Sequence, residues 1–210
     1  TDNRTFLHAL QYAGTFGLTV WLRAQDAALA AGGVAASGAV ASRLGLAGIP
    51  VVAETIALHT ILELVRVTGT RVHLCRLSSA AGLAIVRAAK AEGLPVTCDV
   101  AAHHLHLTDM DIGYFDAQYR LDPPLRAQRD REAIREAARD GTIDALCSDH
   151  TPLAADARLV PFADATPGAS GLELLLSLVL KWADESRVPL VDALARVTHA
   201  PAQRLAHVAP

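Results

Sequence analysis

Polar side chains capable of chemistry follow a short apolar run in the stretch DGTIDALCSDHTPL, residues 140–153. A glycine turn, an apolar run and then a polar cluster is the pattern of a buried parallel strand that ends at an active site. Asp149 and His150 would lie at that end. A carboxylate there can act as a general base toward a metal-bound water or can ligate the metal, and it can also simply cap the next loop. These residues alone leave both alternatives open.

Three earlier apolar runs also end in polar residues. Arg23 follows VWL, Arg76 follows HLC, and Asp99 follows PVTC, with His103 and His104 shortly after it. If the runs are parallel strands of one sheet, their carboxyl ends meet at one edge and these side chains lie together.

The elements that must position these side chains follow from hydrophobic periodicity and from the glycines that interrupt it. Strands are expected at residues 18–22, 71–77, 95–100 and 143–147, and helices at 5–16, 53–68, 80–92, 130–139, 172–185 and 189–205, the last with a break at Pro201. Loops are expected at 32–48, with a short helix at 40–44, and at 152–167, and an irregular segment at 109–126.

Strands that alternate with helices predict a parallel α/β sheet with right-handed crossovers. No G-x-G-x-x-G or Walker sequence follows any strand, so a barrel is favoured over a nucleotide-binding open sheet. Four strands are half of an eight-stranded barrel. We therefore expect residues 1–210 to form a single domain, the later half of a (β/α)8 barrel whose first half is missing from this chain. An open sheet of five or fewer strands is the alternative.

The composition of the chain argues against several classes of function. The chain is 51% hydrophobic and only 4% aromatic, with a formal net charge of -3 and no basic run, so nucleic acid is not an expected partner. Apolar runs are too short to span a membrane, and the first residues lack the pattern of a signal peptide. Cys75, Cys98 and Cys147 each lie in an apolar run and are expected to be reduced core residues, which indicates the cytoplasm.

Seven segments resemble, in order and spacing, the later half of a dihydroorotase of the amidohydrolase superfamily. They are VWLRAQD, GIPVVAET, RVHLCRLSS, AAHHLHLTD, RLDPPLR, DGTIDALCSDHTPL and PGASGLELLL. The resemblance implies a zinc-dependent barrel that interconverts carbamoyl aspartate and dihydroorotate in pyrimidine biosynthesis. It covers nearly the whole chain.

The resemblance also shows where this chain departs from active members. Arg23 and Arg76 stand where the family has two histidine metal ligands. Asp149 matches the family's aspartate, both ligand and general base, whereas Asp122 and Leu153 stand where the family has a substrate-binding asparagine and histidine. The family's HxH motif and bridging ligand would precede residue 1.

The two arginines change the expected chemistry. Zinc requires neutral imidazole or anionic ligands at roughly 2 Å, whereas a guanidinium offers no lone pair and stays charged. We therefore expect no metal cofactor, with Asp149 vestigial and both Arg23 and Arg76 facing it in an ion cluster. Zinc would be needed only if the chain belongs to an active enzyme.

The other candidate side chains are weaker. His103, His104 and His106 contain an HxH spacing that would put two imidazoles on one face of a strand, but active dihydroorotases carry a similar run without using it for metal. His73 is expected to pack in the core and His59 to lie near solvent. Cys98 and Cys147 lack a neighbouring base in sequence and are not expected to be nucleophiles.

Two functions remain open. The chain is similar to non-catalytic dihydroorotases that serve as assembly partners of aspartate transcarbamoylase in some bacteria, notably in RLSS and VWLR-x-QD. The alternative is an active zinc-dependent dihydroorotase, or a related cyclic amidohydrolase, with a remodelled metal site. The helices at 53–68 and 172–185 are the most apolar candidates for a partner surface.

Overall fold

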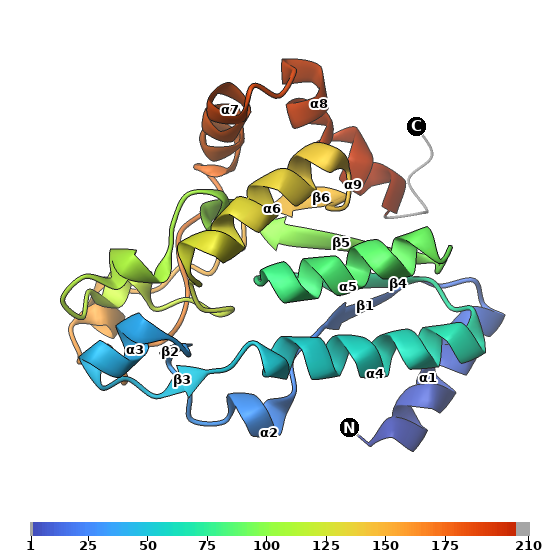
Figure 1. Ribbon diagram of the computed structural model, residues 1–210, viewed down its shortest axis with the longest axis horizontal. Coiled ribbons are helices and arrows are strands. Elements are labelled where there is room, and N and C mark those ends of the chain that lie inside the picture. The colour runs from blue at the N-terminus through green and yellow to red at the C-terminus, as the bar shows by residue number, and fades with distance from the viewer. Residues whose placement is uncertain (1, 205–210) are drawn as a thin grey trace.

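The computed structural model describes residues 2–204, which form a four-stranded parallel sheet with helices against one face (Figure 1). The strand order is β1 (Val20–Arg23), β4 (Val72–Cys75), β5 (Val96–Ala101) and β6 (Ala145–Cys147). The connecting helices are α4 (Val52–Thr68), α5 (Ala80–Ala91) and α6 (Gln128–Asp140). The expected α/β organisation is therefore confirmed, and every expected strand is present.

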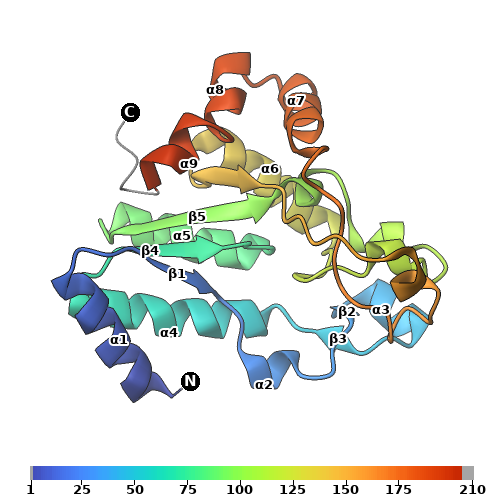
Figure 2. The ribbon, with the colours of Figure 1, turned by 180° about the vertical axis from the view of Figure 1, so that it is seen from behind.

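The two faces of the sheet carry different side chains because neighbouring residues of a strand point to opposite sides. Leu74, Cys98, Val100 and Leu146 are fully or nearly fully buried in the main core, with side chains of α4, α5 and α6. The opposite face is largely uncovered in the described part of the chain (Figure 2). By the alternation of side chains along the strands, this face carries Trp21 and several polar groups. Trp21 is 49% exposed there.

Helix α4 shows how the sequence sets an element's bounds. Leu58, Ile61, Leu62 and Val65 recur at helical spacing and are buried against the sheet. Gly69 ends the helix with a φ of 64°, a left-handed conformation that glycine adopts without the steric cost of a Cβ.

Segments beyond the carboxyl ends of the strands form a second, smaller core (Figure 1). Its buried side chains are Ala35, Ala41, Ile112 and Phe162, which come from three separate segments. The segments contain α2 (Ala27–Ala30), β2 (Ala35–Ala36), α3 (Ala39–Leu44), β3 (Gly48–Ile49) and the 3-10 turns η1 (Ala102–Leu105), η2 (Asp109–Ile112), η3 (Ala117–Tyr119) and η4 (Ala155–Arg158). The short helix expected at 40–44 is present, but the small parallel sheet β2–β3 was not expected.

The remaining helices are α1 (Asn3–Thr15), α7 (Leu175–Ser186), α8 (Leu190–Ala195) and α9 (His199–Arg204). The prediction of one helix over 189–205 with a break at Pro201 is wrong, because the chain leaves helical structure earlier, between α8 and α9. The expected end of that helix at Leu205 lies outside the described residues. All three cysteines are free, as expected. Within residues 2–204, none of the helices has the length and apolar character needed to cross a membrane.

Candidate functional site

Two arginine–aspartate pairs lie at the carboxyl ends of the strands. Arg23, the last residue of β1, forms a bidentate pair with Asp122, each Nη atom donating to one carboxylate oxygen. Arg76 follows β4, and its Nη1 donates to Asp149 Oδ1 at 2.8 Å and to the backbone oxygen of Asp122 at 3.3 Å. Of the five positions at which the resemblance implied a ligand or a substrate contact, the structure therefore brings together all but Leu153.

The pairing differs from the expected one. Arg23 contacts Asp122 and not Asp149, so the prediction that both arginines face Asp149 is wrong. The strand order explains the difference: Asp149 follows β6, which is three positions from β1 and two from β4. Arg76 is thus the nearer partner, and the segment that carries Asp122 supplies the carboxylate for Arg23.

The charges of this cluster shift the pKa values of its members. Burial acts to raise the pKa of Asp122, but hydrogen bonds and charge from Arg23, with Arg76 and Arg120, lower it below the ordinary value. Burial acts to lower the pKa of Arg76, yet Asp149 raises it above its usual value. Both shifts favour the charged forms of Asp122 and Arg76 at neutral pH.

The backbone at one pair adopts an uncommon conformation. Arg76 has a φ of 55° and Asp149 a φ of 45°, both in the left-handed region. Such residues cost roughly 1–3 kcal/mol each and persist where the surroundings hold them. The backbone N–H of Arg76 is held by Asp99 Oδ1 at 2.8 Å. These bends turn both side chains off the strand ends toward each other.

The four residues do not fit a zinc ion. The guanidinium nitrogens of Arg23 and Arg76 carry hydrogens that they donate to carboxylates, and they have no lone pair for a metal. The carboxylates of Asp122 and Asp149 have the donor chemistry of a ligand, but Asp122 accepts hydrogen bonds from Arg23, and Asp149 Oδ1 accepts one from Arg76. Ion pairs occupy the positions where the resemblance implied two histidine ligands.

His103 and His104 are buried and His106 is half-buried, and the HxH spacing does not place two imidazoles on one face of a strand. His103 and His104 lie in the 3-10 turn η1 and not on a strand, and the ring of His106 contacts the backbone oxygen of Leu178 at 2.9 Å. Burial lowers the pKa of His103 to about 4, despite the opposing charge of Asp149, and lowers that of His104 well below its usual value. His103 Nε2 has no hydrogen-bond partner among the described residues.

Two further candidates lie apart from the ion pairs. His150 Nδ1 accepts hydrogen bonds from the backbone of Gly171 and Leu172, both at 3.2 Å, so it orders the turn that precedes α7. Leu153 lines an open depression with Asp116 and Arg158. His59 is exposed, as expected.

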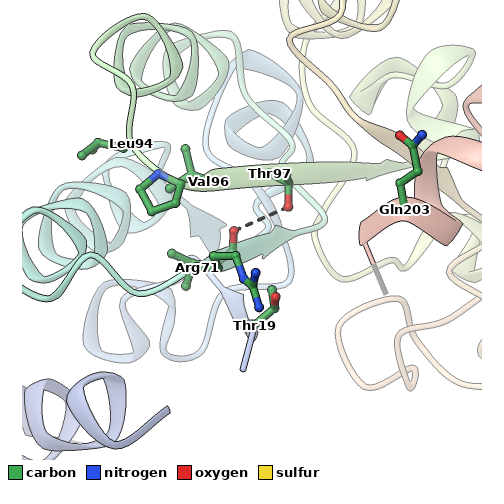
Figure 3. A pocket seen from close by; sticks show the side chains of 8 residues that line it. Thr19, Arg71, Leu94, Val96, Thr97 and Gln203 are labelled. Carbon is green, nitrogen blue, oxygen red and sulfur yellow. Dashed lines mark hydrogen bonds between the residues drawn. The ribbon is translucent and has the colours of Figure 1, made fainter. Parts of the chain in front are cut away.

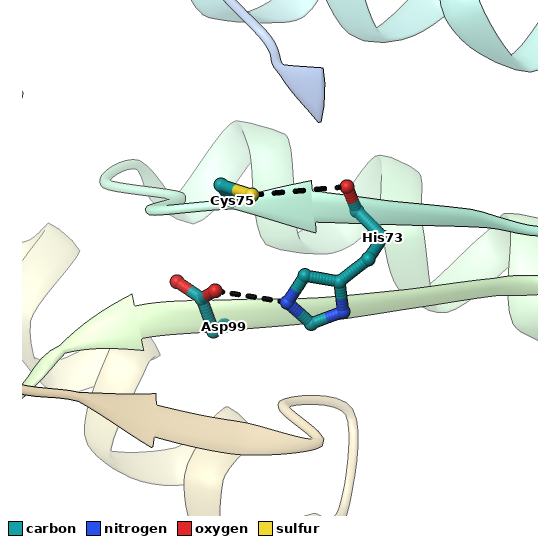
Figure 4. Close-up of side chains that lie close together, drawn as sticks. All are labelled: His73, Cys75 and Asp99. Atoms are coloured by element: carbon teal, nitrogen blue, oxygen red, sulfur yellow. Dashed lines mark hydrogen bonds and ion pairs between the residues drawn. The ribbon is translucent and has the colours of Figure 1, made fainter. Parts of the chain in front are cut away.

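A second polar cluster, on the uncovered face of the sheet, was missed by the sequence analysis. His73 is buried, as expected, but its Nε2 lies 2.8 Å from Asp99 Oδ2 on the neighbouring strand, and Cys75 lies beside this pair (Figure 4). The alternation His-x-Cys on one strand, with an aspartate on the next, was the available signal. Burial raises the pKa of Cys75 to about 11 and that of Cys98 to about 12, and it raises the pKa of Cys147 as well. The thiols are therefore protonated at neutral pH, which agrees with the expectation that Cys98 and Cys147 are not nucleophiles.

An open hollow of about 340 Å³ lies at the other end of the strands (Figure 3). Thr19, Arg71, Leu94, Thr97 and Gln203 are among its lining residues. Arg71 is the only charged residue among the eight that line it, so the hollow offers no acid–base pair. The chemistry of the described chain is concentrated at the carboxyl ends of the strands and on the uncovered face.

Comparison with known proteins gives homologues over nearly the whole chain. The chain is 50% identical over 204 residues to a dihydroorotase-like protein of Pseudomonas aeruginosa, covering 97% of this chain and 48% of the relative. It is 42% identical over 207 residues to a dihydroorotase of Anaeromyxobacter dehalogenans, covering 94% and 48%. No family model matches. The chain spans about half the length of the curated relatives it matches.

Solved structures confirm the fold. An L-hydantoinase (dihydropyrimidinase) from Arthrobacter aurescens matches with a TM-score of 0.84 at 24% identity, covering 98% of this chain and 47% of that one. A dihydroorotase from Saccharomyces cerevisiae, in complex with 5-fluoroorotic acid, matches with a TM-score of 0.78 at 16% identity, covering 99% and 55%. The four-stranded sheet is therefore part of a (β/α)8 barrel, as expected, and not a small open sheet.

Proposed function

We propose that the chain is part of a dihydroorotase-like protein of pyrimidine biosynthesis that has lost catalysis and acts in the cytoplasm as an assembly partner of aspartate transcarbamoylase. The proposal rests on two ion pairs, Arg23 with Asp122 and Arg76 with Asp149. Each arginine stands where the resemblance implies a metal-ligating histidine. A guanidinium paired with a carboxylate cannot replace that ligand.

The 50% identity to a dihydroorotase-like protein supports the family part of the proposal. The non-catalytic part rests on chemistry. Asp149 would serve an active enzyme as base and ligand, but here Arg76 donates to it and stabilises its charged, hydrogen-bonded form. The hydrogen bond from Arg76 occupies the Oδ1 oxygen of this carboxylate, and no zinc-bound water would be held beside it.

The first test of this proposal is an assay of the purified full-length protein in both directions, with zinc supplied. We expect no conversion of carbamoyl aspartate or dihydroorotate above the uncatalysed rate, because two ligand positions carry arginine. A dihydroorotase from another source, assayed in the same buffer, is the positive control. Turnover at an ordinary enzyme rate would overturn the proposal.

The alternative is a working dihydroorotase or related cyclic amidohydrolase with a remodelled metal site. The retained Asp149 and the 42% identity to a protein named dihydroorotase favour it. Turnover that depends on added zinc and is lost in Asp149→Asn would establish this alternative.

The partnership has its own test. Tagged full-length protein, purified from cells that also make untagged aspartate transcarbamoylase, is expected to retain that enzyme through a sizing column at fixed stoichiometry. Helices α4 and α7 expose apolar side chains that such a contact could cover, among them Ile56 and Leu176. Separate elution of the two proteins at micromolar concentration would contradict the partnership and leave the question of catalysis to the assay.

A further inference from the structure

The uncovered face of the sheet brings together three side chains with metal-ligating atoms. His73 and Cys75 lie on β4 and Asp99 on β5, and one ligand atom from each lies within 4.8 Å of the other two (Figure 4). His73 is 2% exposed and Asp99 is 6% exposed, so both polar groups are withdrawn from water. Neither belongs to the pairs formed by Arg23 and Arg76.

We propose that His73, Cys75 and Asp99 bind a single zinc ion, in a site separate from the arginine–aspartate pairs and not needed for catalysis. Imidazole nitrogen, thiolate sulfur and carboxylate oxygen are the three donor types that zinc uses in proteins. A set that mixes soft sulfur with harder oxygen and nitrogen favours zinc over magnesium or calcium, which prefer oxygen ligands throughout.

Neighbouring groups already orient two of the three ligands. His73 Nδ1 lies 2.7 Å from Thr97 Oγ1, and the Thr97 hydroxyl in turn lies 3.5 Å from the backbone oxygen of Val72, to which it can donate. In the metal-free site Nε2 carries the ring hydrogen and donates it to the Asp99 carboxylate, which can only accept. With a cation in place of that hydrogen, Nδ1 would carry the ring hydrogen and donate it to the Thr97 oxygen, which leaves the Nε2 lone pair for the metal. The backbone N–H of Arg76 holds Asp99 Oδ1, so Oδ2 is the oxygen that faces Nε2. Outer partners of this kind fix the tautomer and orientation of metal ligands.

The charges of the proposed site also balance. Binding releases the Cys75 thiol proton to solvent, so one thiolate, one carboxylate and one neutral imidazole surround a divalent cation with a net charge of zero. A neutral assembly avoids the cost of burying an uncompensated charge. The ligand atoms of a tetrahedral zinc lie roughly 3–4 Å apart. The 2.8 Å contact between Nε2 and Oδ2 must therefore open slightly, while Cys75 moves closer. The fourth position would be taken by water, which keeps the net charge at zero.

Cobalt provides the test, because a thiolate bound to Co²⁺ produces a charge-transfer band in the near ultraviolet. Full-length protein freed of metal with a chelator and titrated with Co²⁺ is expected to bind one ion with this band and to lose the band when Zn²⁺ is added. Cys75→Ser should abolish the band and weaken binding by more than about 100-fold, since it removes a ligand itself. Thr97→Val should weaken binding by roughly 10- to 100-fold, as loss of an outer partner does, and keep the band.

Cys98→Ser is the matched control. Cys98 is fully buried on the helix-covered face, where its sulfur contacts the backbone oxygen of Thr142, so both band and affinity should be unchanged. Should Cys75→Ser fail to fold, Asp99→Asn tests the same site, because its amide oxygen can still accept the N–H of Arg76 while the carboxylate is lost.

Absence of the band in the wild-type protein would overturn the inference, and so would a band that survives both Cys75→Ser and Asp99→Asn. The outcome is independent of the assay described above. Cobalt bound through Cys75 without turnover supports both the non-catalytic function and the metal site. Turnover in a Cys75→Ser protein would contradict the non-catalytic function and would not support a metal site at His73, Cys75 and Asp99.

Discussion

Lowering the pH from 7 to 4 is expected to destabilise the folded protein by roughly 3 kcal/mol through His103 alone. Burial lowers the pKa of His103 to about 4 in the folded state, against an ordinary value of 6.5. Between these values the unfolded chain takes up a proton that the folded chain does not, so the unfolded state gains stability as the pH falls. The difference of about 2.5 pKa units corresponds to roughly 3 kcal/mol.

The sign follows from which form the folded state prefers. The stability that His103 contributes is fully present above its unfolded pKa of 6.5 and is lost as the pH falls toward 4. His104 acts in the same direction, because burial and the neighbouring His103 lower its pKa as well. Its ring lies 4.7 Å from that of His103, so the two sites are coupled and their effects will not simply add.

The measurement is the free energy of unfolding in urea across pH 4 to 7.5, for wild-type protein and for His103→Gln. The variant should take up about one proton fewer on unfolding between pH 6.5 and 4. Because His103 Nε2 has no partner in the described residues, glutamine forfeits no hydrogen bond of that atom. His59→Gln, on the exposed face of α4, is the matched control for a histidine-to-glutamine change away from this site. Equal proton uptake by wild type and His103→Gln would contradict the prediction.

Replacement of Glu54 by alanine is expected to cost about 3–5 kcal/mol of unfolding free energy. Glu54 is 5% exposed and its carboxylate accepts hydrogen bonds from the backbone N–H and hydroxyl groups of both Ser78 and Ser79. These residues lead into α5, where a carboxylate is favoured by the helix dipole. Alanine would leave four buried donors without their acceptor.

Helix α5 packs so closely on the Glu54 carboxylate that neighbouring side chains cannot simply rearrange when it is changed. A Cβ at Gly82 would lie 2.2 Å from Glu54 Oε1, so α5 approaches the carboxylate at a position that only glycine allows. The Ser78 hydroxyl also accepts a hydrogen bond from Arg126 Nε at 2.8 Å, and Arg126 is 4% exposed. Loss of Glu54 therefore removes the acidic group from a buried series of hydrogen bonds that runs through Ser78 to Arg126.

Glu63→Ala on the same helix is the matched control. The Glu63 side chain is 71% exposed and pairs only with Arg66 in the described structure, so its removal should change stability by less than about 0.5 kcal/mol. Urea unfolding of both variants at pH 7 gives the comparison. A cost for Glu54→Ala within 1 kcal/mol or so of that for Glu63→Ala would show that the network contributes little.

The fold was largely predictable because its strands and helices carry strong local signals. The apolar runs that end in Arg23, Arg76, Asp99 and Asp149 are all strands of one parallel sheet. Details of helix faces are harder to predict: helical periodicity in the sequence puts Ile56 on the apolar side of α4, yet Ile56 is 47% exposed, whereas Leu58 is fully buried. Periodicity indicates that a face is buried, but tertiary packing decides which residues at its margin are covered.

The site was only partly predictable, because its contacts join residues far apart in the chain. Arg23 and Asp122 are separated by 99 residues, and nothing in either local sequence specifies that pairing. The contact between His73 and Asp99 depends on the parallel register of β4 and β5, which sequence alone did not provide. The residue types were visible in advance; their partners required the order and register of the strands.

The second core has a consequence for how the molecule opens. This core contains only four buried apolar side chains, of which two are alanines, and the other apolar side chains packed against it are partly exposed. So little burial offers much less protection against local opening than the main core around β4 and β5. Backbone amides of α3 and the 3-10 turns should therefore exchange with deuterium through sub-global openings, while those of β4 and β5 exchange only when the whole domain unfolds. The carboxyl ends of the strands lie at the boundary between a slowly and a rapidly exchanging unit of the same chain.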